Sequence, residues 1–296
     1  MMKRFILPIL LVALLLVSCE PSYERTEGEA SYDSVVFIGV DGAGEWLSKA
    51  EGFSQVFSSS SAWTGTATSE APSVSAQNWG SYLHGVSPSV HKCVNASIAC
   101  ERFPYSQYPS VFKILREVYP NATLASFTEW NAINYGLIET SAGVYKSSDR
   151  RFCSTVYSTS EIMDMTLEYL ESTTPTFLFV HIEDADDAGH GTGYGNEKHL
   201  AAVQNDMDFI KKVDAAIDYS RTLLIVATDH GGTGCIHGGS TPEETNITIA
   251  VKGKTIAQMK LSDTVTPKDI APVILKALGV KKPSFMEGDI PEGLTL

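Results

Sequence analysis

Acidic residues and histidines recur just after apolar segments of the chain, where their side chains could bind a metal ion. The clearest group is Asp229, His230 and His237, which follows the apolar run 223–227. A short apolar run bounded by glycines is typical of a buried strand, and open α/β sheets place their sites at the carboxyl ends of strands. Carboxylate and imidazole together suit a divalent transition metal. Taken alone, the group is equally compatible with a hydrogen-bonded turn.

Two further predicted strands end in residues of the same types. Asp41 follows the apolar run 35–40, and Asp186 and His190 follow the run 176–182. Because Asp186 and His190 are four residues apart, they face the same way on one helical turn. The alternatives are a plain turn at Asp41 and a solvated loop around Asp186. Three such coincidences in one sheet are less expected than one, so we interpret the three strand ends as a shared metal centre.

Ser75 is the candidate nucleophile that such a centre would activate. It precedes a predicted helix over 77–84, where backbone N–H groups and the helix dipole favour an anion such as phosphate. Asn78, one turn further on, could donate a hydrogen bond to the same oxyanion. The alternative for Ser75 is an ordinary helix cap, and the many neighbouring serines mean that composition does not single it out.

The order of these residues resembles that of the alkaline phosphatase superfamily, and in particular its type I phosphodiesterase/nucleotide pyrophosphatase branch. That branch has a Thr or Ser nucleophile in a segment ending Pro-Asn, then Gly-x-x-Pro-x-x-His, then Glu-Pro-Asp-x-x-Gly-His. The corresponding segments here are 75–78, 85–91 and 184–190, followed by similar stretches at 237–244 and 269–272. The resemblance extends over residues 34–280.

The resemblance implies two metal sites. One would hold Asp41, Ser75, Asp229 and His230, and the other would hold Asp186, His190 and His237. Zinc is the usual metal in this family, although the ligand chemistry alone also allows Mn²⁺ or Fe²⁺. Two metals would lower the pKa of the serine hydroxyl and hold both oxygens of an in-line displacement. The implied reaction is attack by Ser75, formation of a phosphoseryl enzyme, and hydrolysis by water.

The chain departs from the family pattern at three positions, none of which is a proposed ligand. Gln77 and Ala185 stand in place of prolines, and Lys92 stands where glycine is common. We therefore expect the chemistry to be retained and the substrate contacts to differ. Sulfatases share the fold but need a Cys/Ser-x-Pro-x-Arg pattern. The segment 73–77 lacks that pattern, which argues against sulfate esters.

These features predict a metal-dependent phosphoric ester hydrolase of the phosphodiesterase/nucleotide pyrophosphatase type, acting on a small phosphate ester. A phosphomonoesterase on the same centre is the first alternative. A cationic group beside the phosphate would favour a monoester and an apolar slot a diester, and the sequence does not distinguish them. The second alternative is a lipid-anchored binding protein without turnover. Such a protein would be expected to lack a metal ligand, and none is missing here.

The predicted fold is α/β, with an alkaline phosphatase-like, mostly parallel and doubly wound sheet that carries helices on both faces. The chain has 296 residues, of which 43% are hydrophobic, and this suffices for one large domain, placed at 34–296. The alternation of strands and helices is typical of a parallel sheet. Strands are expected at 34–40, 122–127, 176–182, 222–228 and 247–251, and helices near 76–84, 110–118, 160–171, 197–217 and 267–278.

Only six residues separate His230 from His237, so no cap domain fits between them. Any lid over the site is therefore expected from the loops 93–109 and 131–159. The candidate substrate contacts in or beside these loops, each with packing as its alternative, are Trp130, Tyr135, Arg150 and Arg151. The histidines that we interpret as structural are His84, His91, His181 and His199.

The first residues predict export. A basic start and a short apolar run over 5–17 are typical of a signal peptide, here 1–18, and the run is too short for a comfortable membrane span. Leu-Val-Ser before Cys19 resembles the lipobox of bacterial lipoproteins, with a polar tether over 19–33. Lipid on Cys19 would anchor the protein to a membrane of the bacterial cell envelope, and Glu20 fits the outer membrane. A simple secretory signal is the alternative.

Four cysteines follow the predicted signal and Cys19, and in an oxidising envelope they would allow two disulfides in three pairings. They are Cys93, Cys100, Cys153 and Cys235. Cys93 and Cys100 are close enough in sequence to pair across a loop. Cys235 lies between His230 and His237, and this position suggests metal ligation as an alternative. We favour a disulfide or a free thiol there, because the histidines already complete the ligand set that the family implies.

The net charge of −13 disfavours binding to long nucleic acids, whose phosphates would be repelled. A small phosphate ester remains compatible with this charge, because two dications would dominate the field inside the site.

Overall fold

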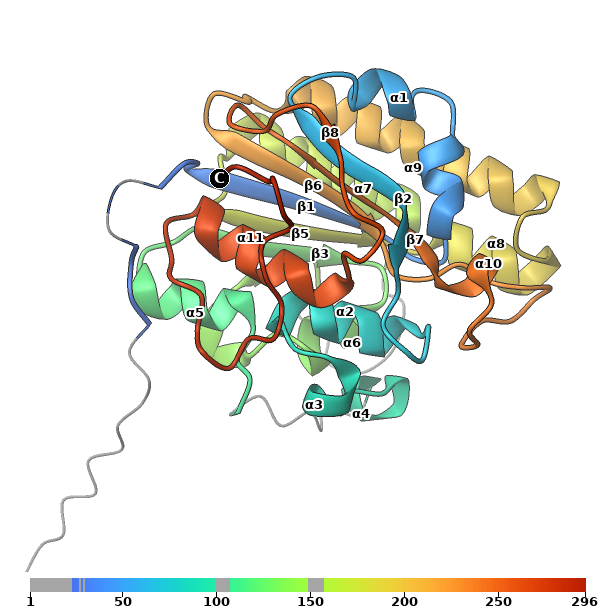
Figure 1. Ribbon diagram of the computed structural model, residues 1–296, viewed down its shortest axis with the longest axis horizontal. Coiled ribbons are helices and arrows are strands. Elements are labelled where there is room, and N and C mark those ends of the chain that lie inside the picture. Colours follow the sequence, from blue (N-terminus) through green and yellow to red (C-terminus); the bar gives the residue numbers. More distant parts are fainter. Residues whose placement is uncertain (1–22, 27, 29, 100–106, 149–156) are drawn as a thin grey trace, which may run out of the picture.

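Eight strands form one mixed sheet in the order β4-β3-β5-β1-β6-β7-β2-β8 (Figure 1). The computed structural model describes residues 23–26, 28, 30–99, 107–148 and 157–296. The strands are β1 Ser34–Val40, β2 Ser61–Thr68, β3 Leu124–Thr128, β4 Tyr145–Lys146, β5 Phe177–Ile182, β6 Thr222–Thr228, β7 Asn246–Lys252 and β8 Met259–Lys260.

The central strand β1 is buried along its whole length. Alternate side chains enter two different cores: Val35 and Phe37 face one, and Val36 and Ile38 face the other. Burial on both faces explains why this strand is an unbroken apolar run rather than an alternating one. Its parallel partners β5 and β6 have the same character, so these three strands form the rigid centre of the sheet.

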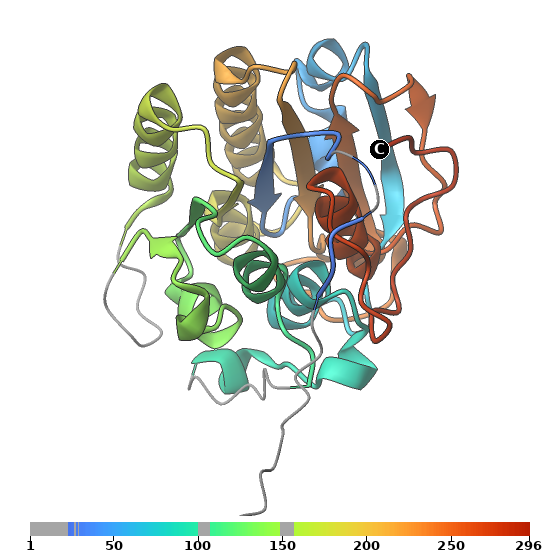
Figure 2. The ribbon, with the colours of Figure 1, turned by 90° about the vertical axis from the view of Figure 1, so that its left-hand side faces the viewer.

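Helices cover both faces of the sheet, as Figure 2 shows. The core that contains Val35 also contains residues of α2, α5, α6 and α11, and the core that contains Val36 contains residues of α1, α7 and α9. The α-helices are α1 Phe53–Val56, α2 Ser75–His84, α3 Pro88–His91, α4 Asn95–Ala99, α5 Val111–Val118, α6 Asn131–Gly136, α7 Thr159–Ser172, α8 Asp184–Thr192, α9 Glu197–Ala216, α10 Pro242–Thr245 and α11 Ile270–Ala277. The 3₁₀ helices are Gly44–Lys49, Thr140–Ala142 and Pro267–Asp269.

The predicted fold class is confirmed, and the five predicted strands match β1, β3, β5, β6 and β7 to within two residues at each end. The arrangement of β7, β2 and β8 on one side of the sheet was not predicted. β7 runs antiparallel to both β6 and β2. No helix in the described part of the chain combines the length and the apolar composition needed to cross a membrane.

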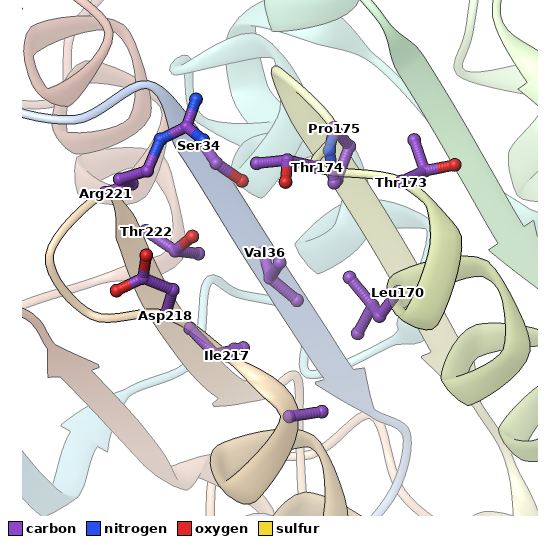
Figure 3. Close-up of a pocket in the computed structure, with 11 residues that line it drawn as sticks. Ser34, Val36, Leu170, Thr173, Thr174, Pro175, Ile217, Asp218, Arg221 and Thr222 are labelled. Atoms are coloured by element: carbon purple, nitrogen blue, oxygen red, sulfur yellow. The ribbon is translucent and has the colours of Figure 1, made fainter.

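The register of the central strands brings three chain segments together at one edge of the sheet. Val40 is paired with Ile182 of β5 and with Thr228 of β6, so the residues that follow all three strands emerge side by side. A cavity of about 90 Å³ lies at the opposite edge, where the same strands begin (Figure 3). Ser34, Thr222 and Arg221 line it. This cavity is therefore remote from the residues predicted to do chemistry.

Candidate metal centre

Two overlapping groups of metal-ligand side chains lie at the carboxyl edge of the sheet. Asp41, Asp229 and His230 form one group, and Asp186, His230 and His237 form the other. Within each group the ligand atoms lie within 4.8 Å of one another. The predicted strand ends thus converge on one place, with His230 between the two groups.

Backbone carbonyls orient the three histidines of the centre in the same way. Nδ1 of His190 lies 3.0 Å from the carbonyl oxygen of Cys235, and Nδ1 of His237 lies 2.9 Å from that of Ser73. Nδ1 of His230 lies 2.9 Å from the carbonyl oxygen of its neighbour Gly231. Because a carbonyl oxygen can only accept, each Nδ1 carries a proton, and Nε2 is the nitrogen left to face a metal ion. This arrangement is typical of metal-ligating imidazoles.

The buried carboxylates leave negative charge that a cation would balance. Oδ1 of Asp229 accepts a hydrogen bond from the backbone N–H of Gly42 at 3.0 Å. Oδ2 of Asp229 is buried, accepts no hydrogen bond from a described residue, and lies 3.2 Å from Nε2 of His230. Burial and the charge of Asp41 raise the pKa of Asp229 well above its usual value. Burial opposes protonation of His230, but Asp229 and Asp41 outweigh it and raise its pKa to about 10. A divalent ion fits this donor set, since it would satisfy Oδ2 and neutralise both carboxylates.

Ser75 opens helix α2 beside this centre. Its Oγ lies 3.2 Å from Nε2 of His230 and 3.4 Å from Oδ1 of Asp41, and only 6% of the residue is exposed. The N-cap of α2 is Val74, and no side chain caps the helix. The alternative interpretation of Ser75 as an ordinary helix cap is therefore wrong. The hydroxyl points at the carboxylate and imidazole group instead.

Two buried side chains hold Asp41 from behind. Nε1 of Trp79 donates to Oδ2 of Asp41 at 2.9 Å, and Nε2 of His181 lies 2.9 Å from the same oxygen. Burial would raise the pKa of Asp41, but hydrogen bonds to His181 and His230 hold it well below its usual value. His181 was interpreted as a structural histidine. Its contact shows that the residue also orients a candidate ligand, which sequence reasoning missed.

Asn78 has a different task from the one expected. It is fully buried, its Oδ1 accepts from the backbone N–H of Glu70 at 2.8 Å, and its Nδ2 donates to the carbonyl oxygen of Val74 at 3.0 Å. The amide therefore holds the turn that precedes Ser75 rather than facing an oxyanion. Asn95 at the start of α4 contacts the first turn of α2 beside Ser75, because its Oδ1 accepts from the backbone N–H of Ala76 at 3.1 Å.

Ser73 joins the nucleophile segment to the segment that carries His237. Besides the contact of its carbonyl oxygen with Nδ1 of His237, its Oγ donates to the carbonyl oxygen of Gly239 at 2.9 Å. It also accepts from the backbone N–H of Gly238 at 3.2 Å. Ser75 and His237 are therefore held at a fixed separation by hydrogen bonds that the sequence did not reveal.

His190 adjoins the second group from the end of α8. Its Nε2 lies 3.3 Å from Oδ2 of Asp186, and its ring centroid lies 5.0 Å from that of His237. The hydrogen bond to Asp186 raises the pKa of His190 to about 9. The i to i+4 spacing predicted from the sequence thus places these two side chains together. With 45% of its side chain exposed, His190 is the candidate ligand most open to solvent.

Two of the candidate substrate contacts have partners within the described structure. Trp130 packs against the core, and Tyr135 donates from its hydroxyl to the carbonyl oxygen of Ser148 at 2.6 Å. Cys93 is a buried free thiol and Cys235 an exposed one, and neither belongs to the ligand groups. The predictions that lie outside the described residues are those for the signal peptide, Cys19, Cys100, Arg150, Arg151 and Cys153.

The fold and this site are those of a metalloenzyme with an alkaline phosphatase-like architecture. The sequence profile of the Metalloenzyme superfamily matches residues 127–282, more than half of the chain, and the protein belongs to that superfamily. A curated relative, 2,3-bisphosphoglycerate-independent phosphoglycerate mutase from Wolbachia pipientis wMel, is 29% identical over 139 residues. That match covers 44% of this chain and 26% of the relative.

Solved structures support the same fold at low sequence identity. Murine ectonucleotide pyrophosphatase/phosphodiesterase 5 superposes with a TM-score of 0.65 and 11% identity, covering 84% of this chain and 95% of that one. A 2-O GAG sulfatase gives a TM-score of 0.63 and 14% identity, with 87% and 73% covered. An alkaline phosphatase superfamily protein from Vibrio parahaemolyticus gives 0.61 and 12%, with 90% and 71% covered.

Proposed function

We propose that the protein is a metal-dependent phosphoric ester hydrolase in which Ser75 is the nucleophile. The observation that carries this proposal is the position of Ser75 Oγ, 3.2 Å from His230 and 3.4 Å from Asp41. A nearly buried hydroxyl at a helix start, facing carboxylate and imidazole ligands, has the arrangement that an activated nucleophile requires.

We assign the residues that would hold two divalent ions, which we propose to be Zn²⁺, to two sites as the family resemblance implies. Asp41, Asp229 and His230 with Ser75 would bind one ion, and Asp186, His190 and His237 the other. When bound, the ions would supply the positive charge that lowers the pKa of the hydroxyl and neutralises the phosphate. The three imidazoles are already oriented for this through their Nδ1 hydrogen bonds.

The proposed reaction begins with attack of the Ser75 hydroxyl on the phosphate ester. Oγ of Ser75 forms a bond to phosphorus while the bond to the ester oxygen breaks, and the alcohol leaves with a proton. The side-chain N–H group of Asn95 and the backbone at the start of α2 would stabilise the equatorial oxygens. Water then attacks the phosphorus of this serine ester, the bond to Oγ breaks, and the product leaves as a phosphate monoester while Ser75 regains its proton.

A phosphodiester substrate is favoured over a monoester and over a sulfate ester. The motif order resembles the phosphodiesterase branch, and the murine ectonucleotide pyrophosphatase/phosphodiesterase covers most of this chain. The sulfatase pattern Cys/Ser-x-Pro-x-Arg is absent from 73–77, although sulfatases are among the similar structures. A phosphomonoesterase on the same centre is the second candidate, since the same ligands would serve it.

The experiment is a comparison of three chromogenic esters at the same zinc concentration. We expect bis-(p-nitrophenyl) phosphate to be cleaved faster than p-nitrophenyl phosphate, and p-nitrophenyl sulfate not to be cleaved. Ser75→Ala should retain its metal content and lose activity by several orders of magnitude, as loss of a nucleophile does in other hydrolases. Unchanged activity in that variant would overturn the proposal, whereas a preference for the monoester would select the second candidate.

A further inference from the structure

Tyr194 lies between the two chain segments that carry the ligands proposed for the second metal site, Asp186, His190 and His237. Its hydroxyl donates to Oδ1 of Asp186 on α8 at 2.5 Å. Its backbone N–H donates to the carbonyl oxygen of Gly234, in the loop that leads to His237, at 2.7 Å. Its ring centroid lies 5.7 Å from that of His190 and 6.2 Å from that of His237. One residue thus contacts all three candidate ligands of this site.

Two glycines make room for the ring. A Cβ atom at Gly189, directly before His190, would lie 2.4 Å from Cε1 of Tyr194. A Cβ atom at Gly232, in the loop after β6, would lie 2.3 Å from Cδ2 on the other side of the ring. Both distances are far below van der Waals contact, so any side chain would displace the ring. The phenol is therefore held in a slot formed by the two ligand-bearing segments.

We propose that Tyr194 is the positioning residue of the second metal site, an inference that rests on the proposed two-metal function. By donating to Oδ1 of Asp186, the hydroxyl fixes the rotation of the carboxylate and leaves Oδ2 beside Nε2 of His190, 3.3 Å away. By holding Gly234, the backbone keeps the His237 loop against α8. Partners of this kind, which orient ligands without binding the metal, typically change metal affinity by about 10- to 100-fold.

The test is a Co²⁺ titration of the metal-free full chain, followed by the visible absorption of the bound ion. In Tyr194→Phe we expect the first Co²⁺ to bind as in the unmodified protein, and the second to bind about 10- to 100-fold more weakly. Tyr219→Phe is the matched control. The hydroxyl of Tyr219 also donates to an aspartate at 2.5 Å, that of Asp214, before the strand β6 begins. This control should bind both ions normally.

Equal affinity for the second Co²⁺ in Tyr194→Phe and the unmodified protein would overturn the inference alone. A single Co²⁺ per chain in the unmodified protein would overturn the two-metal function and this inference with it. Gly232→Ala tests the ring separately, because its added methyl group should weaken the second site only where the ring is present. If the methyl group had the same effect in a Tyr194→Ala background, the ring would have no positioning role.

Discussion

Nε2 of His181 lies 2.9 Å from Oδ2 of Asp41, and neither side chain is exposed to solvent. Trp79 donates to the same oxygen, so this half of the carboxylate is fully occupied from behind. Oδ1 is consequently the oxygen that faces Ser75 and His230. The two contacts thus leave Oδ1 as the oxygen of Asp41 that is available to an ion, and His181 exerts this effect from within strand β5.

Substituting His181 should therefore weaken the first metal site. In His181→Leu, Asp41 loses one of its two fixed partners, and we expect affinity for the first Co²⁺ to fall by about 10- to 100-fold. Trp79→Phe, which removes the other donor and keeps an aromatic ring, should have an effect in the same direction. Titration of the metal-free protein measures both. If His181→Leu bound the first ion normally, the contact would have only a packing role.

Asn95 and Asn78 should have separable effects. Asn95→Ala should lower kcat by about 100-fold, the usual loss when one donor to a transition-state oxyanion is removed, and should leave metal content unchanged. Asn78→Ala should instead lower the free energy of unfolding by about 1–3 kcal/mol, because it leaves buried partners without hydrogen bonds. Steady-state kinetics and thermal unfolding of the two variants provide the comparison. A loss of kcat in Asn78→Ala together with a loss of stability in Asn95→Ala would instead support Asn78 as the donor to the oxyanion.

Asp206 should make the stability of the protein depend on pH. It is fully buried on α9, and neither carboxylate oxygen accepts a hydrogen bond from a described residue. Burial, reinforced by Asp184 and Glu129, raises its pKa well above the usual value. The folded protein therefore keeps the proton while the unfolded chain loses it above about pH 4, so stability falls as pH rises from there.

Asp206→Asn removes this titration and should stabilise the metal-free protein at pH 8, where the unfolded chain has lost the proton that the folded protein keeps. The difference should vanish near pH 4. Asp208→Asn, on the exposed side of the same helix, is the control. A hydrogen bond from Lys211 lowers the pKa of Asp208, so its loss should slightly destabilise the protein at neutral pH. A stabilisation by Asp206→Asn that did not change with pH would contradict this account.

Membrane attachment is predicted to depend on Cys19, which lies outside the described residues. We propose that the full chain expressed in a bacterium is recovered with membranes and released by detergent. In Cys19→Ser, which cannot carry the lipid, the mature protein should move to the soluble envelope fraction. Fractionation followed by immunoblotting measures the change. Membrane recovery of Cys19→Ser equal to that of the unmodified chain would favour another means of attachment.

The central strands could be predicted because they are buried on both faces and therefore consist of uninterrupted apolar runs. β1, β5 and β6 are of this kind. β2 could not, because Ser61–Thr68 is rich in threonine and small residues and lies next to the outermost strand. The direction of β7 could not be predicted either, since it depends on the path of residues 229–245 between β6 and β7 rather than on the composition of the strand.

The candidate ligands were predictable for the same reason: each follows an apolar run or lies on one helical turn. The residues that orient them were not, because their contacts depend on the fold rather than on spacing in sequence. His181 is 140 positions from Asp41 and has the character of a core histidine. Asn95 is 19 positions from Ala76. Tyr194 has no motif of its own, and its proposed role rests on its hydrogen bonds to Asp186 and Gly234 and on the slot between two glycines.

The most direct test of the central claim is to identify the residue that becomes phosphorylated during turnover. The zinc-loaded protein would be mixed with excess bis-(p-nitrophenyl) phosphate and quenched in acid, and its peptides would be mapped by mass spectrometry. We predict that one p-nitrophenylphosphoryl group, which is what remains when the diester loses one p-nitrophenol, is found on Ser75 and is absent from Ser75→Ala. Turnover with no phosphorylated peptide, or with the modification on another residue, would contradict the proposed nucleophile.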